Sequence, residues 1–238
     1  MRHSQRALIP LLFFILGAVT AFSLGAREQP AKLSGTVIPH PASASDFTLP
    51  DQGGASFHMA DTKGRVVVMT FIYTHCTDLC PFVALKLKSA HDQLGKDADK
   101  AVFVAVTTDP ERDTQQVIAA YSRAAGLSDS WHFLTGPTAS VKAVWFNYGI
   151  GVEIEKEKKD QPEAKPGNAK DEPEPTQGLS PAEVDQAHRI VAAFGGGYDV
   201  SHSAPFWFID RQGRIRASMD ADALPSEIAG NVRALIGS

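Results

Sequence analysis

One uninterrupted apolar stretch restricts the folds available to this chain. Residues 66–73 are VVVMTFIY, a β-branched stretch without the polar alternation of a strand that has one face in water. Such a segment is typical of a central strand buried on both faces. Residues 101–107 (AVFVAVT) repeat the pattern, and a helix is expected between the two segments. Strands alternating with helices predict an α/β fold with a parallel central sheet and right-handed crossovers.

The remaining patterns predict further elements along the chain. We expect helices over 81–94, 113–125, 138–147, 180–194 and 223–236, and short strands over 47–49 and 132–135. The fourth helix begins with a capping box, in which Ser180 is the N-cap, Pro181 is N1 and Glu183 is N3. Near the C-terminus, two apolar segments flank a Gly-containing loop and predict a β-hairpin over 205–209 and 215–219.

The N-terminal segment has the composition of a leader. Residues 7–24 contain no charged residue, 14 of the 18 are apolar, and Arg2 and Arg6 precede them. This pattern predicts either a secretory signal or an N-terminal membrane anchor over residues 1–25, and in both cases the rest of the chain is exported. A tether rich in Pro, Ala and Ser is expected over residues 26–45, followed by one domain over residues 46–238.

A charged, Pro-rich insertion interrupts this domain over residues 155–178. It has almost no apolar side chains, so it cannot bury enough surface to offset the entropy of ordering, and we expect solvated chain there. The formal net charge of the whole chain is −4, which argues against nucleic acid as a partner. Two cysteines in 238 residues exclude a disulfide-stapled scaffold.

Both cysteines lie in one short segment between a buried strand and the start of a helix. Cys76 and Cys80 are four residues apart in CTDLCP, and this spacing brings two side chains to one face of a helical turn. The positive end of a helix dipole favours the thiolate, which is the form that binds a soft metal or attacks a disulfide. A pair of buried structural cysteines, or a structural disulfide, is the alternative.

Two thiolates leave a soft metal short of a ligand, and eight histidines are available. His202 is the candidate, because it comes just before a strand-like segment, and in a thioredoxin-like topology the loop before that strand faces the start of the Cys-bearing helix. On sequence alone, a lone His in a loop is more often an ordinary surface residue than a ligand. His75 follows an extended segment directly before Cys76, so its side chain should point away. Five others have no motif around them and are expected to be surface or capping residues: His40, His58, His91, His132 and His188.

Four segments together resemble the SCO/SenC family of copper-binding, thioredoxin-like proteins: FIYTHCTDLCP, TTDPERDTQQVIAAY, FLTG and DVSHSAPFWFIDRQG. The resemblance extends over residues 45–155 and 195–237. The family pattern is Cys-x-x-x-Cys-Pro, then Asp-Pro-x-x-Asp, then a distant His, and in this chain it falls on Cys76, Cys80, Pro81, Asp109, Pro110, Asp113 and His202. The chain departs from the pattern at Thr77, where many relatives have Pro, and at Ser201, where Asp is common.

The resemblance implies a thioredoxin-like central sheet flanked by helices, and one copper ion, as Cu(I) and also Cu(II), bound by Cys76, Cys80 and His202. It implies a metallochaperone that supplies copper to the binuclear copper site of cytochrome c oxidase or prepares the cysteines of that site. The partner is then the copper-bearing subunit of the oxidase or another copper protein. It also implies an N-terminal helix in the bacterial or mitochondrial inner membrane, with the domain in the periplasm or the intermembrane space.

The chemistry of this ligand set agrees with copper. Two thiolates and one imidazole suit three-coordinate Cu(I), whereas zinc normally takes four ligands. Asp78, between the cysteines, is either a weak ligand for Cu(II) or a cap for the helix. Asp109 and Asp113 also fit ordinary turn and N-cap positions.

A thiol–disulfide oxidoreductase is the alternative function, with Cys76 and Cys80 as the redox pair. His202 separates the two hypotheses, because the copper site requires this side chain and thiol exchange does not. A peroxide-reducing enzyme of similar fold is disfavoured, since the cysteine motif of those enzymes is absent.

Overall fold

The computed structural model describes residues 32–155 and 175–238. Within these residues the main sheet has six strands, in the order β1-β10-β9-β4-β5-β6. The prediction of parallel central strands is confirmed, because β5 runs parallel to β4 and to β6. The predicted C-terminal hairpin makes the sheet mixed, since β9 pairs antiparallel with both β10 and β4. The strands are β1 (Thr36–Val37), β4 (Val66–Ile72), β5 (Ala101–Thr107), β6 (His132–Leu134), β9 (Phe206–Ile209) and β10 (Ile215–Met219).

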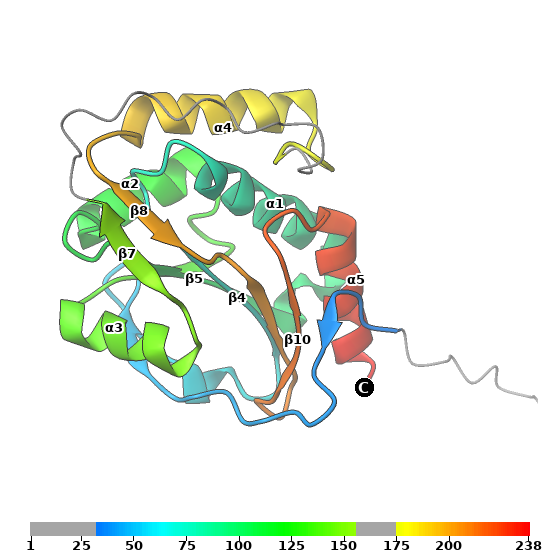
Figure 1. Ribbon diagram of the computed structural model, residues 1–238. Helices are drawn as coiled ribbons and strands as arrows, with labels where there is room; N and C mark the ends of the chain where they lie inside the picture. The colour runs from blue at the N-terminus through cyan, green and yellow to red at the C-terminus, as the bar shows by residue number, and fades with distance from the viewer. Residues whose placement is uncertain (1–31, 156–174) are drawn as a thin grey trace, which may run out of the picture.

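Helices cover both faces of the main sheet (Figure 1). Alternate side chains of β4 enter two separate cores, as expected for a strand buried on both faces. Val66, Val68 and Ile72 pack in a core with α1 (Leu79–Leu94), α2 (Gln115–Ala125) and α5 (Pro225–Ile236). Val67, Met69 and Phe71 pack in the other core with α3 (Thr138–Asn147). The described residues also contain two short 3₁₀ segments, Met59–Thr62 and Gly95–Lys100.

The helix α4 (Pro181–Phe194) lies over α1 and α2 (Figure 1). Its predicted capping box is confirmed: the Glu183 amide donates to Ser180 Oγ, and the Ser180 amide donates to the Glu183 carboxylate. Ala187 and Ile190, one turn apart on the inner face, are buried in the core around α1. The chain therefore recovers regular structure after the predicted insertion.

Two small two-stranded sheets accompany the main sheet in the described residues. β2 (Thr48–Pro50) pairs with β3 (Ser56–His58), and β7 (Val152–Glu155) pairs with β8 (Asp199–His202). Of these strands only β2 corresponds to a sequence prediction. β7 and β8 are short and lie on opposite sides of the charged insertion in the sequence. No local sequence pattern therefore indicated that they pair.

Several predicted boundaries are wrong. The helix α1 begins at Leu79 rather than at residue 81, so Cys80 already lies in its first turn. The helix α2 begins at Gln115 with Thr114 as its N-cap, since Thr114 Oγ1 accepts from the Val117 amide. Asp113 is therefore not the N-cap. α5 begins at residue 225, two residues later than predicted.

Parts of the predicted tether and insertion have regular structure. Thr36 and Val37, inside the expected tether of residues 26–45, pair with β10 as an edge strand of the main sheet. The predicted insertion over residues 155–178 overlaps β7, which ends at Glu155. Residues 156–174 of that insertion, and the predicted leader over residues 1–25, lie outside the described residues. Across residues 32–155 and 175–238, none of the helices combines the length and the apolar character that crossing a membrane requires.

Candidate metal centre

The two cysteines lie at the carboxyl end of β4, where the chain turns into α1. Cys76 belongs to the connecting loop and Cys80 to the first turn of α1. Both side chains are buried, with exposed fractions of 7% and 2%, and both are free thiols. Two reduced sulfurs therefore lie near one helix start, but Cys76 precedes the helix and does not share a helical turn with Cys80.

The two thiols have different acidities. The pKa of Cys76 is lowered from 9.0 to about 7, chiefly because the Cys80 thiol donates a hydrogen bond to the Cys76 sulfur. Burial raises the pKa of Cys80 well above its ordinary value, since the charged form would lose its hydration. Near neutral pH the pair therefore consists of a partly ionised Cys76 and a protonated Cys80.

His202 turns its Nε2 atom toward the thiols. This nitrogen lies 3.8 Å from the sulfur of Cys80, and Nδ1 lies 3.1 Å from the carbonyl oxygen of Ser203. Because a carbonyl can only accept, we assign the ring proton to Nδ1, which leaves the lone pair of Nε2 facing the sulfur. Burial lowers the pKa of His202, so the ring is neutral near pH 7. A neutral imidazole with a free nitrogen is the form that binds metals.

One cavity of about 350 Å³ contains all three predicted ligands. Its lining comes from the Cys-bearing loop, the start of α1 and the strand β8: Tyr73, Cys76, Thr77, Asp78, Leu79, Cys80, Asp199, Val200, Ser201, His202 and Ala204. A larger cavity of about 740 Å³ lies where β5 and β6 begin, and neither cysteine lines it. The chemistry of the lining, and not the size, therefore identifies the candidate site.

The donors in the smaller cavity suit a soft cation, because two thiols and one imidazole are ligands that Cu(I) prefers. In the part of the chain that the structure describes, no group of three or more His, Cys, Asp or Glu side chains is already arranged to hold a metal ion. The assignment of Cys76, Cys80 and His202 as a ligand set thus stays a prediction, and binding would require the three groups to draw closer together.

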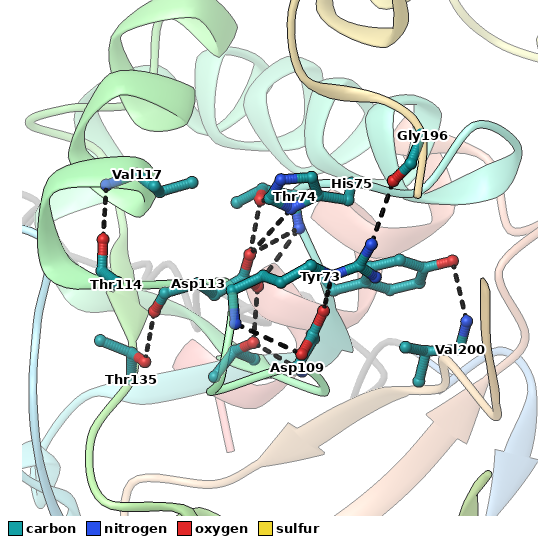
Figure 2. Close-up of polar contacts among 12 residues, drawn as sticks. Tyr73, Thr74, His75, Asp109, Asp113, Thr114, Val117, Thr135, Gly196 and Val200 are labelled. Carbon is teal, nitrogen blue, oxygen red and sulfur yellow. Dashed lines mark hydrogen bonds and ion pairs between the residues drawn. The ribbon is translucent and has the colours of Figure 1, made fainter. Parts of the chain in front are cut away.

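Asp113 holds the loop that leads into Cys76 through buried hydrogen bonds, a role that the sequence did not indicate. Its carboxylate is fully buried and accepts hydrogen bonds from the Thr74 amide at 3.2 Å, from Thr74 Oγ1 at 2.5 Å and from Thr107 Oγ1 at 2.6 Å. Figure 2 shows Asp113 between Thr74 and Thr135, whose hydroxyl donates to the Asp113 carbonyl oxygen. These bonds fix the residues that lead into Cys76.

Tyr73, which the sequence analysis assigned only to a buried strand, contacts both His202 and the Cys76 thiol. Its hydroxyl accepts a hydrogen bond from the Val200 amide at 3.3 Å (Figure 2). Its ring meets the His202 ring edge-on, with centroids 5.7 Å apart. A hydrogen bond from the same hydroxyl contributes to the lowered pKa of Cys76. An aromatic residue at the end of a central strand gave no sequence signal of this position.

Asp78 and His75, the polar neighbours of the cysteines in the motif, differ in their relation to the cavity. Asp78 occupies the N-cap position of α1 and lines the cavity, but its side chain makes no capping hydrogen bond. His75 does not line the cavity; its Nδ1 lies 2.9 Å from Thr74 Oγ1, as expected for a side chain pointing away. The remaining described histidines that the sequence analysis set aside, His40, His58, His91, His132 and His188, do not line it either.

Comparison with known proteins identifies relatives of this chain. The family model described as SCO1/SenC matches residues 36–167. The chain is 30% identical over 148 residues to a SCO2-like protein of Rickettsia felis, covering 60% of this chain and 71% of that protein. It is 38% identical over 103 residues to the mitochondrial SCO2 homologue of Homo sapiens, covering 42% of this chain but only 36% of the human protein.

Solved structures agree in fold. The structure of Bradyrhizobium japonicum ScoI with copper bound superposes with a TM-score of 0.59 at 24% identity, covering 82% of this chain and 99% of that one. Yeast Sco1 with copper bound gives a TM-score of 0.58 at 21% identity, covering 83% and 90%. The expected thioredoxin-like α/β fold is confirmed. Because the matched family model begins at β1 and covers more than half of this chain, the chain belongs to the SCO1/SenC family.

Proposed function

We propose that this protein carries one copper ion, bound by the sulfurs of Cys76 and Cys80 and by Nε2 of His202, and delivers it during cytochrome c oxidase assembly. The observation that carries the proposal is the convergence of these three donors on one cavity, with Nε2 of His202 3.8 Å from the Cys80 sulfur. The names of relatives support it: two similar structures are described with copper bound, and a third protein as a member of the Sco family of cytochrome c oxidase assembly proteins.

The protonation states of the three groups suit copper as a cargo. Cys76 is already partly ionised at neutral pH and His202 offers an unprotonated nitrogen, so Cys80 is the group that must give up most of the protons released when the metal binds. Two sulfurs and one nitrogen give Cu(I) a low coordination number. A ligand of the acceptor protein can then enter, and copper passes by ligand exchange.

The acceptor in this proposal is the copper-bearing subunit of cytochrome c oxidase. Leu79, which lies between the two cysteines in the sequence, lines the cavity, is 40% exposed and provides an apolar contact for a docking protein. The leader over residues 1–25 would anchor the chain in the inner membrane, with the domain in the periplasm or the intermembrane space.

Reduction of the acceptor's cysteines is the second candidate function, and the lowered pKa of Cys76 favours it. The Cys76 thiolate attacks one sulfur of the target disulfide, forms a mixed disulfide and releases one target thiolate, which takes up a proton. Cys80 then loses its proton and attacks the Cys76 sulfur. The products are a Cys76–Cys80 disulfide and a target with two thiols, so two electrons have moved to the target. One similar structure is described as showing a disulfide switch.

Titration of the full-length chain in detergent separates the two functions. The reduced protein and its His202→Ala variant are titrated with Cu(I) in competition with a chelator, and His58→Ala, a histidine on β3 away from the cavity, is the matched control. We expect one Cu(I) per chain, weaker binding by His202→Ala and unchanged binding by His58→Ala. Equal affinities in all three would contradict the three-ligand site. Disulfide reduction that survives in His202→Ala would then favour the oxidoreductase.

A further inference from the structure

The segment that carries His202 lies outside the main sheet, although Val200 is buried against the core around α1. Residues 195–198 connect α4 to β8, and Gly196 and Gly197 both have positive φ, at 121° and 86°. In the described structure β8 pairs only with β7, in a sheet separate from the main one. The distance between His202 and the cysteines therefore depends on contacts that connect this segment to the body of the domain.

Arg112 provides the most extensive of these contacts. It lies in the loop between β5 and α2, and its guanidinium donates to the carbonyl oxygens of Gly196 at 3.0 Å and Tyr198 at 2.8 Å. The same group lies 3.5 Å from the centroid of the Tyr198 ring. Three contacts from one planar cation thus define the course of the chain just before β8.

Asp109 in turn fixes the orientation of the Arg112 guanidinium. The side chain of Asp109 is fully buried and pairs with Nε of Arg112. The hydroxyl of Tyr198 donates to the other oxygen of the same carboxylate at 2.9 Å. In Figure 2, Asp109 and Gly196 lie on opposite sides of the Tyr73 ring. The side chain of Arg112 is only 17% exposed, so water competes little for its donors.

Two backbone contacts complete the connection to the cysteine loop. The Gly196 amide donates to the carbonyl oxygen of His75 at 3.1 Å, and the Val200 amide donates to the Tyr73 hydroxyl at 3.3 Å. The guanidinium of Arg112 also lies 5.8 Å from the centroid of the Tyr73 ring. Arg112 therefore contacts both sides of the junction, the segment before His202 and the strand end before Cys76.

We propose that Arg112 is a positioning residue for His202, which holds the chain before β8 at the distance from Cys76 and Cys80 that lets the imidazole bind the same copper ion. The proposal rests on the proposed copper function. Arg112 lines no part of the cavity and is not a ligand, so it acts only through the geometry of His202.

A double-mutant cycle on the full-length, detergent-solubilised chain tests this role. Arg112→Lys keeps the positive charge but cannot donate from a planar fork to both carbonyl oxygens. We expect it to weaken Cu(I) binding roughly 10- to 100-fold, as loss of a group that orients a metal ligand does. In the His202→Ala background the same change should have no further effect, because the ligand that Arg112 positions is gone. Arg123→Lys, an exposed position on α2, is the matched control.

A measurement without metal distinguishes positioning from general stability. Amide hydrogen exchange of the metal-free protein should become faster over residues 196–202 in Arg112→Lys, while exchange in β5 and α5 stays at the wild-type rate. Uniformly faster exchange, or an equal loss of Cu(I) affinity with and without His202, would assign Arg112 a merely structural role and overturn the proposal. Wild-type protein that binds no Cu(I) would overturn the proposed function itself, whereas wild-type binding with unchanged affinity in Arg112→Lys would overturn only the inference.

Discussion

Replacing Cys80 with alanine should raise the pKa of Cys76 from about 7 toward its ordinary value of 9.0. The hydrogen bond from the Cys80 thiol is the largest cause of the lowered value, and alanine removes that donor. Cys80→Ser is the matched control, because a serine hydroxyl of similar size can still donate. The pKa of Cys76 in this control should stay closer to that of the wild type.

The higher pKa of Cys76 in Cys80→Ala should slow the reaction of this thiol at pH 7 and accelerate it at pH 10. At pH 7 about half of the wild-type Cys76 is thiolate, against about 1% for a thiol with a pKa of 9, which is a roughly 50-fold difference in the reactive form. A thiolate with the higher pKa is about 6- to 10-fold more nucleophilic, because nucleophilicity rises with basicity. Cys80→Ala should therefore react about 5- to 8-fold more slowly than wild type at pH 7 and about 6- to 10-fold faster at pH 10.

Alkylation with iodoacetamide, followed at the Cys76 peptide by mass spectrometry between pH 5 and 10, measures both limbs of this curve. The rates of wild type and Cys80→Ala should cross between pH 7 and 10, and those of Cys80→Ser should remain near wild type. Parallel curves with the same midpoint for all three proteins would refute the reasoning, because the lowered pKa would then have another origin than the neighbouring thiol.

Three further predictions concern the stability of the fold, measured as the midpoint of urea unfolding. Asp113→Ala leaves the buried donors of Thr74 and Thr107 without an acceptor and should lower the free energy of unfolding by about 3–5 kcal/mol, whereas the exposed Asp129→Ala should change it little. Lys86→Met should raise the midpoint at pH 7, because burial lowers the pKa of Lys86; this gain should shrink as the pH approaches 10.5, where the unfolded chain also loses its proton. Ser180→Ala removes the N-cap of α4 and should cost about 1 kcal/mol.

The main sheet and the pair of cysteines were predictable because their signals are local. The apolar residues of β4 and β5 leave few alternatives to buried strands, and two cysteines four residues apart before a helix indicate their own chemistry. The placement of His202 near them followed from topology rather than from the residues around it. Its strand, β8, has the sequence DVSH, which is too short and too polar to be distinguished from a loop.

Most of the supporting contacts were not predictable, since they join segments that are distant in sequence. Asp113 was expected as an N-cap, and its partner Thr74 lies 39 residues away. Tyr198 reaches Asp109 across 89 residues, and the Val200 amide reaches Tyr73 across 127. A carboxylate in a turn sequence has the same local pattern whether it caps a helix or is buried under a loop, so only the packed structure distinguishes the two.

The cysteines and His202 belong to two parts of the fold: the cysteines follow a strand of the main sheet, and His202 lies on a separate small sheet. The cysteines continue directly from β4, the middle of the main sheet, and Asp113 holds their loop from within the core. His202 belongs to a two-stranded sheet that is connected to the body through Arg112, Tyr73 and the amide of Gly196. Disulfide exchange needs only the first part, whereas a three-ligand copper site needs both. A change that loosens β8 should therefore reduce copper binding and leave the reactivity of Cys76 and Cys80 intact, which makes the attachment of β8 the feature that separates the two chemistries in this protein.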